Sequence, residues 1–272
     1  MPHAKITGLN LYPVKSCRGI AVESVTITDT GFAFDRRWMV VDENGRFQTQ
    51  RELPRLAVIH TQLSDGRLRL SANDMPDLVV GDPGQGERRA VKVWSDQCSG
   101  LDAGDAAAGW LSQFLHKKLR LLSFDTSTRR ACDPSYAGDV PATTMFADAF
   151  PFLVLSESSL INLNRRLDKT LPMNRFRPNI VLNGVQAHEE DRIRELRAGD
   201  VCIRLVKPCD RCSITTTDQV TGLRRGDEPL RTLKSYRWDP KLRGVTFGQN
   251  GILVSGAGAS LRVGQEFDIT WV

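Results

Sequence analysis

Cys209 and Cys212 are the residues of this sequence whose type and spacing are best suited to chemistry. Lys207 and Arg211 lie beside them, and the run Thr215–Thr217 follows. Positive charge fixed near a thiol favours the thiolate, which is both a nucleophile and a ligand for soft metals. The segment therefore predicts a reactive or metal-binding sulfur, and the β-branched threonines predict a strand after it.

Three chemical interpretations of the cysteine pair remain open on the residues alone. A structural zinc site needs a second pair of Cys or His ligands, and the four histidines are scattered along the chain. A thioredoxin-type dithiol begins a helix, which the threonines after Cys212 disfavour. The third interpretation is a single thiolate bound to a redox metal. On spacing alone, two buried thiols beside a turn are the simplest interpretation.

Other polar segments lie next to expected strands. Lys15 and Ser16 offer a point charge and a hydroxyl, which together suit a phosphate or carboxylate. Arg36 precedes an apolar run, where it also fits a surface ion pair. Arg177 and Asn179 precede another apolar run, and a guanidinium presents a planar fork to anions and heterocycle edges. Taken singly, each segment equally fits a solvated loop or a polar turn.

The composition is that of a soluble globular protein. Of 272 residues, 40% are hydrophobic and 25% are charged, which allows one large or two ordinary domains. The net charge of +5 is a mild excess without a basic run, so an anionic small molecule is expected as a ligand and a nucleic acid is not. No signal-peptide core and no membrane-spanning apolar run are evident, so we expect a cytoplasmic protein without membrane association.

The first part of the chain predicts short strands separated by turns. Asn44-Gly45 and Asp65-Gly66 supply the positive φ angles of tight hairpins. Apolar residues at helical spacing predict a helix that opens at residue 102 or 103 and continues to 115. Strands are expected at residues 5–11, 24–28, 38–41, 46–49, 58–63, 67–70, 91–94 and 119–124.

The second part of the chain is mixed. A polar stretch over residues 125–142 predicts a loop, and we place the domain boundary at its start, giving domains 1–124 and 125–272. Ser156 is expected to cap a helix that continues to Leu167, and Pro229 to open a second helix. Strands are expected at 152–155, 179–182, 201–206, 251–254 and 261–271. The predicted fold is a β-barrel-rich α+β structure.

Several motifs in one order carry a resemblance to a known family. They are YPVKSCRG, DRRWMVVD, FPFLVLSESSLINLN, FRPNIVLNG, PCDRCSITTTDQVTG, PLRTLKSYR and FGQN. Together they resemble the MOSC family, in particular the group of the mitochondrial amidoxime-reducing component and its bacterial YcbX-like relatives. The resemblance spans nearly the whole chain. It implies an N-terminal MOSC β-barrel domain followed by the MOSC domain.

The resemblance implies a molybdenum cofactor, a molybdenum-pyranopterin. In that family one protein cysteine binds the metal, which matches Cys212 here, whereas Cys209 matches a structural position. Asp218 matches an acidic residue just past the metal cysteine, and we group it with Cys212 as a candidate catalytic residue. The candidate cofactor-binding residues are Lys15, Ser16, Arg36, Asp148, Ser156, Arg177, Asn179 and Arg211.

The activity that the resemblance implies is reduction of N-hydroxylated compounds, such as hydroxylamines, amidoximes or N-hydroxylated bases. The sequence has no C-x4-C-x2-C pattern and no G-x-G-x-x-G in a βαβ context, so a separate ferredoxin, flavodoxin or reductase is expected to supply electrons. Two alternatives stay open. One is a cofactor carrier or sulfur-transfer module, and the other is a dithiol redox protein that uses Cys209 and Cys212.

Overall fold

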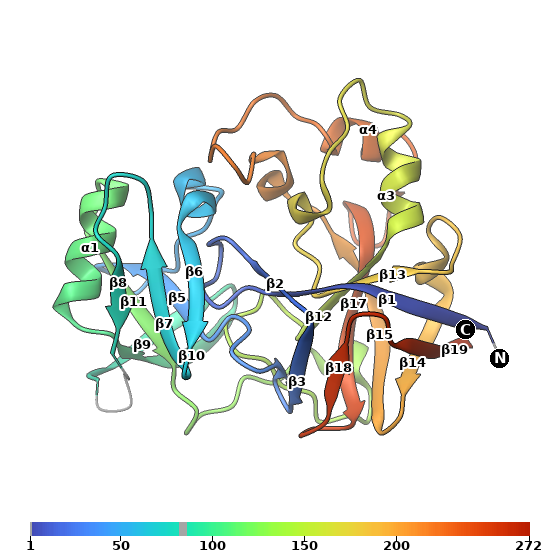
Figure 1. The fold of residues 1–272 in the computed structure, drawn as a ribbon, viewed down its shortest axis with the longest axis horizontal. Helices are drawn as coiled ribbons and strands as arrows, with labels where there is room; N and C mark the ends of the chain where they lie inside the picture. The colour runs from blue at the N-terminus through green and yellow to red at the C-terminus, as the bar shows by residue number, and fades with distance from the viewer. Residues whose placement is uncertain (1, 82–85) are drawn as a thin grey trace.

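The computed structural model describes residues 2–81 and 86–272 and contains two β-rich bodies side by side (Figure 1). The larger body is a closed barrel of seven strands, in which β12 pairs with both β13 and β17. All neighbours are antiparallel except β12 and β13. In barrel order the strands are β12 (Phe152–Ser156), β13 (Ile180–Asn183), β1 (His3–Leu11), β19 (Glu266–Trp271), β14 (Ile193–Ala198), β15 (Val201–Asp210) and β17 (Gly244–Ser255).

The barrel holds the largest apolar core of the molecule. Alternate residues of its strands point inward, and Ile6, Leu196, Ile203 and Phe267 are fully buried there. Two short strands extend the barrel sheet, β2 (Ile20–Val22) and β16 (Trp238–Asp239). A separate three-stranded sheet packs beside it, in the order β18 (Ser260–Arg262), β3 (Ser24–Thr28) and β4 (Gly31–Phe32). The α-helices of this body are α2 (Pro134–Ala137), α3 (Glu157–Asn164) and α4 (Leu230–Lys234).

In the described residues, the smaller body contains two sheets, one α-helix and the 3₁₀ helix η1 (Pro54–Val58). Its core joins α1 to both sheets through Trp110 and Phe114, which pack with Leu56, Leu68 and Leu121. One sheet is β5 (Trp38–Asp42), β11 (Leu119–Phe124), β10 (Asp96–Asp102) and β9 (Arg88–Val93), the other is β6 (His60–Ser64), β7 (Arg67–Ser71) and β8 (Leu78–Val80), and the helix is α1 (Asp105–Leu115).

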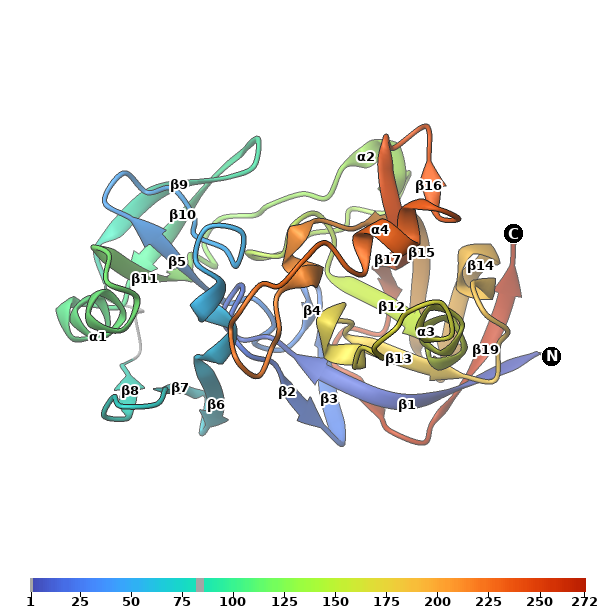
Figure 2. The ribbon, with the colours of Figure 1, turned by 90° about the horizontal axis from the view of Figure 1, so that it is seen from above.

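The chain enters the barrel before it builds the smaller body. β1 pairs with β13 and β19, and β3 pairs with β18, so the first strands complete a barrel that the second half of the chain mostly forms (Figure 2). The predicted β-barrel-rich α+β class is confirmed. The division into 1–124 and 125–272 stays a prediction, and in space the smaller body begins near β5.

The strand predicted after Cys212 is wrong. Residues Ser213–Thr216 form a short 3₁₀ helix, η5. Two threonine hydroxyls donate back to carbonyls three residues earlier, Thr215 to Cys212 at 2.9 Å and Thr216 to Ser213 at 2.8 Å. Hydroxyl side chains can satisfy the backbone locally in this way, and here that outweighs the strand preference of β-branched residues.

Two of the longer strands, β10 and β14, were missed together with the short strands β2, β4, β8 and β16, and two predicted elements are shorter than expected. In β10 and β14 charged and polar residues share the strand with apolar ones, which hides the alternation. The strand expected at 46–49 shrinks to isolated bridges that include Val41 with Phe47. The expected Ser156 cap is confirmed, since its hydroxyl accepts a hydrogen bond from the Ser159 amide, but α3 ends at Asn164. In the described part of the chain, no helix is both long and apolar enough to cross a membrane.

Barrel closure requires a glycine at position 248. Gly248 lies in β17 with φ of +80°, and a Cβ there would lie 2.8 Å from the carbonyl oxygen of Val154 in β12. Gly199 also has a positive φ, +57°, but a Cβ there would meet nothing within 4 Å. A side chain would strain the backbone at both positions, but only at Gly248 would it also contact a neighbouring strand.

We predict that Gly248→Ala destabilises the protein more than Gly199→Ala. The left-handed conformation alone should reduce the free energy of unfolding by about 1–2 kcal/mol in both variants. At Gly248 the clash with β12 adds to that loss. Urea denaturation of both variants measures the difference, and equal losses would contradict the role assigned to the contact.

Candidate functional site

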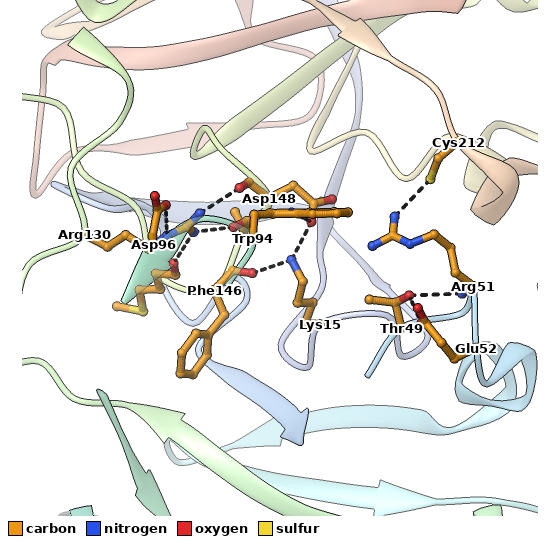
Figure 3. Close-up of polar contacts among 12 residues, drawn as sticks. Lys15, Thr49, Arg51, Glu52, Trp94, Asp96, Arg130, Phe146, Asp148 and Cys212 are labelled. Carbon is orange, nitrogen blue, oxygen red and sulfur yellow. Dashed lines mark hydrogen bonds and ion pairs between the residues drawn. The ribbon is translucent and has the colours of Figure 1, made fainter. Parts of the chain in front are cut away.

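Cys212 lies where the two bodies meet, and we call this boundary the seam. It follows the end of β15 and caps η5, with its carbonyl accepting a hydrogen bond from the Thr215 amide at 3.1 Å. Its Sγ accepts a hydrogen bond from Arg51 Nη1 at 3.3 Å (Figure 3). Arg51 belongs to the smaller body, so the Cys212 sulfur of one body faces a guanidinium of the other.

Arg51 and Trp94 were missed by the sequence analysis. The Arg51 amide is held by Thr49 Oγ1 at 3.1 Å, and the Thr49 hydroxyl donates to Glu52 at 2.6 Å, which fixes a tight turn. The Arg51 guanidinium stacks on the Trp94 ring at 4.5 Å from its centroid. Trp94 Nε1 then donates to Asp148 at 3.0 Å (Figure 3). Neither residue belongs to a sequence motif, and 161 positions separate Arg51 from Cys212.

Lys15 and Asp148 form an ion pair at the same seam. Lys15 Nζ lies 2.7 Å from Asp148 Oδ1 and donates to the Phe146 carbonyl at 2.8 Å. Burial lowers the pKa of Lys15, and Asp148 partly offsets this. For Asp148, burial raises the pKa, but the charge and hydrogen bond of Lys15 bring it below its usual range. The side chain of Asp148 is 62% exposed, so water screens part of this attraction.

Arg36 and Arg177 lie against the same tyrosine. Their guanidinium carbons are 4.3 and 4.2 Å from the centroid of the Tyr12 ring. Arg36 pairs with Asp35 and donates to Asn179 Oδ1 at 3.0 Å. Burial raises the pKa of Tyr12 to about 12 and, with the charge of Arg36, lowers the pKa of Arg177 to about 10. The structure thus brings together three of the predicted cofactor-binding residues.

Three predicted cofactor-binding residues have strained backbones. The φ angles are +69° at Ser16, +47° at Arg36 and +56° at Arg177. A side-chain-bearing residue in this region costs about 1–3 kcal/mol, and such residues cluster at functional sites. Ser16 is also buried, and its carbonyl accepts a hydrogen bond from Gln50 Nε2 at 2.7 Å.

Arg211 contacts Cys209, the first of the two cysteines. Its Nη1 donates to Cys209 Sγ at 2.9 Å, and its Nη2 donates to the Phe176 carbonyl at 2.7 Å. Burial raises the pKa of Cys209, and Arg211 partly offsets this. Both Cys209 and Cys212 are free thiols. Cys209 lies in β15 and is covered by Arg211, whereas Cys212 lies beyond the strand.

Ser156 and Asp218 are engaged elsewhere. The Ser156 hydroxyl donates to Glu190 at 2.9 Å and caps α3, so the structure assigns it a place in the barrel and not in the seam cluster. Asp218 accepts hydrogen bonds from the amides of Val220 and Thr221, which lower its pKa, and pairs with Arg175 at 3.0 Å. Its carboxylate therefore shapes the turn after η5.

Among these seam residues, buried and partly buried positive charge exceeds negative charge. Among the residues described above, Lys15, Arg36, Arg177 and Arg211 face the carboxylates of Asp35 and Asp148. The Nε atom of Arg211 and that of Arg175 are buried without a partner within the described residues. Buried charges need partners, so this excess favours an anionic occupant. Cys212 borders the same seam through its contact with Arg51.

The fold and the site define a protein of the MOSC class. Residues 3–118 match the MOSC N-terminal beta barrel domain, and residues 141–268 match the MOSC domain. The chain belongs to the MOSC family, among the relatives of the mitochondrial amidoxime-reducing components.

Mammalian relatives are similar over most of their length. The chain is 38% identical to mitochondrial amidoxime reducing component 2 of Rattus norvegicus, over 86% of this chain and 73% of the relative. It is 38% identical to component 1 of Homo sapiens, over 91% of this chain and 78% of the relative. For component 2 of Homo sapiens the identity is 36%, over 88% and 74% of the two chains.

We predict that Asp148→Asn destabilises the protein more than Lys15→Met. The first change leaves a buried ammonium without its counter-ion, a loss of about 3 kcal/mol in the free energy of unfolding. The second leaves a carboxylate that water can reach. Urea denaturation at pH 7 measures both.

The pH dependence gives a second readout of the same pair. Because the folded state lowers the pKa of Asp148, its stabilising effect is present above the ordinary value of 3.8 and disappears as the pH falls below it. The difference in free energy of unfolding between wild type and Asp148→Asn should therefore become smaller below pH 3.8. Two results would contradict the stabilising ion pair of Lys15 and Asp148. One is a larger loss of stability in Lys15→Met than in Asp148→Asn, and the other is a stability difference between wild type and Asp148→Asn that does not change with pH.

Proposed function

We propose that this protein is a molybdenum cofactor-dependent reductase of N-hydroxylated compounds. The observation that carries the proposal is the solitary sulfur of Cys212 in a seam with excess buried positive charge. The names of the mammalian relatives support the substrate class, because they describe amidoxime-reducing components.

The residues of the seam fit the proposed cofactor. In the described part of the chain, no group of three or more His, Cys, Asp and Glu could hold a metal ion. A metal at Cys212 would therefore take its other ligands from a non-protein group, as a pterin dithiolene provides. Arg36, Arg177 and Arg211 would bind the anionic phosphate and the heterocycle edge, with Asn179 as a further polar partner.

When bound, the cofactor would supply two-electron redox chemistry, while the protein binds, orients and tunes it. The overall reaction consumes two electrons and two protons, breaks the N–O bond, and releases the amine or amidine and water. Asp148 is ionised at neutral pH, like any aspartate whose pKa is not raised, so we assign it the role of accepting hydrogen bonds from substrate N–H groups. Trp94 and Lys15 hold that carboxylate in place.

The electrons would come from a separate ferredoxin, flavodoxin or reductase. These 272 residues contain neither a ferredoxin cysteine pattern nor a nicotinamide fingerprint, which supports this proposal. We propose the cytoplasm as the location, whereas the names of the relatives describe mitochondrial proteins. Reduction of benzamidoxime with an artificial reductant tests the activity without the natural donor.

We predict that Cys212→Ala abolishes benzamidoxime reduction and that Cys209→Ala keeps most of it. Mutation of residues that merely support a metal ligand costs about 10–100-fold, so loss of the ligand itself should exceed that range. Elemental analysis should show molybdenum in Cys209→Ala and its loss in Cys212→Ala.

The same variants distinguish the alternatives. Equal loss of activity in both variants would favour a dithiol mechanism, which needs both sulfurs. A persulfide on Cys212, detected by mass spectrometry, would favour a sulfur-transfer module. Full activity of Cys212→Ala would contradict the proposed metal ligand.

A further inference from the structure

An open cavity of about 930 Å³ lies on the smaller body beside the seam. The turn after β5, strand β9 and the start of β10 form most of its wall. Its volume is within the range of about 300–1,000 Å³ that is usual for small-molecule sites. The proposed reaction as described so far makes no use of it.

Two residues connect the cavity to the reactive centre. Arg51 lines the cavity and donates to Cys212 Sγ at 3.3 Å. Trp94 also lines the cavity and donates to Asp148 at 3.0 Å. Figure 3 shows Arg51 beside Cys212 and Trp94 beside Asp148. Arg51 and Trp94 therefore each border the cavity and also contact a group of the seam.

The cavity wall is positively charged. Arg46, Arg51, Lys92 and Arg129 line it, against the single carboxylate of Glu52. Glu52 is engaged by the Thr49 hydroxyl at 2.6 Å and lies 3.9 Å from Arg46. Within residues 2–81 and 86–272, neither Lys92 nor Arg129 has an ion-pair partner. A concave wall with one sign of charge concentrates ligands of the opposite sign, so the cavity favours an anion.

The cavity wall is also aromatic. Phe47 and Trp94 both line it, and their rings meet edge to face with centroids 5.3 Å apart. Trp94 is 48% exposed, although Arg51 stacks on its ring. Exposed aromatic surface in a cavity offers a flat contact for another ring. The positive charge and the aromatic lining of the cavity together suit a ligand with a planar ring that carries an oxyanion.

We propose that this cavity binds the part of the substrate distant from the N–O bond and selects aromatic substrates that carry an oxyanion, a carboxylate or a phosphonate-like group. Lys92 and Arg129 are the specificity-determining residues, and Phe47 and Trp94 contact the ring. This inference rests on the proposed function, because it concerns the substrate of the same reaction.

Matched substrates test the inference on the cofactor-loaded protein with an artificial reductant. Benzamidoxime is compared with its 4-carboxy and 4-phosphono derivatives, which separates carboxylate from phosphonate recognition. We expect KM to be about tenfold lower for at least one anionic substrate, the effect of two exposed ion pairs. The preference should weaken as salt is raised, because exposed charges are screened.

Charge-matched variants locate the effect. Lys92→Gln with Arg129→Gln should remove the preference and leave benzamidoxime turnover unchanged. Arg67→Gln with Arg69→Gln removes the same charge from β7, outside the cavity lining, and should keep the preference. Reduction of benzamidoxime with no preference for either anion, or a preference that survives the first variant, would overturn this inference and leave the proposed function standing.

Binding supplies a readout independent of turnover. Isothermal titration of 4-carboxybenzamidoxime into the cofactor-free full chain should give a weaker Kd with the Lys92/Arg129 variant than with the Arg67/Arg69 variant. If no N-hydroxylated compound is reduced, the proposed function fails, and this titration still decides whether the cavity binds aromatic anions. Equal affinities in both variants would overturn the inference.

Discussion

Buried positive charge between the two bodies is the constraint on which the rest of the structure depends. Burial and the neighbouring charge of Arg36 lower the pKa of Arg177 to about 10, a sign that the guanidinium is held in an unfavourable place. The fold offsets part of this with backbone carbonyls and with the ring of Tyr12, which both guanidiniums contact. Asp35 pairs with Arg36, whereas Arg177 has no ion-pair partner among the described residues. This unpaired positive charge favours an anionic occupant of the seam.

Polar contacts across the seam connect this cluster to Cys212. The side-chain amides of Gln50 and Gln219 donate to each other at 3.2 and 2.9 Å, and both are buried. Arg224, from the loop after η5, donates to the Gln50 carbonyl at 2.6 Å. The turn that carries Arg51 is thus fixed by the chain that carries Cys212. A buried polar network of this kind specifies one arrangement more strictly than apolar packing does.

The sequence predicts some residues of the candidate site and not others, and the difference lies in what positions each residue. Lys15, Arg36 and Arg177 could be found because they lie at strand ends within motifs. Arg51 and Trp94 could not, since only the packing of the two bodies brings them to Cys212 and Asp148. The barrel class could be predicted from the short strands with alternating apolar residues. In the sequence, however, a serine that caps a helix or a carboxylate that holds a turn cannot be distinguished from a ligand. Ser156 and Asp218 show this: one caps α3 and the other holds the turn after η5, and their roles as site residues stay predictions.

The two cysteines show the same limit most clearly, because residue type and spacing treat them as equals. The backbone ladder between β15 and β17 ends near Asp210, and the Arg211 amide still bonds the Val245 carbonyl at 2.7 Å. Cys209 precedes this point and is covered by a guanidinium, and burial raises its pKa. Cys212 follows it, where the threonine hydroxyls turn the chain into η5 and the sulfur meets Arg51. The end of one strand therefore makes two identical side chains chemically different, and only the second sulfur faces the seam where an anionic occupant would lie.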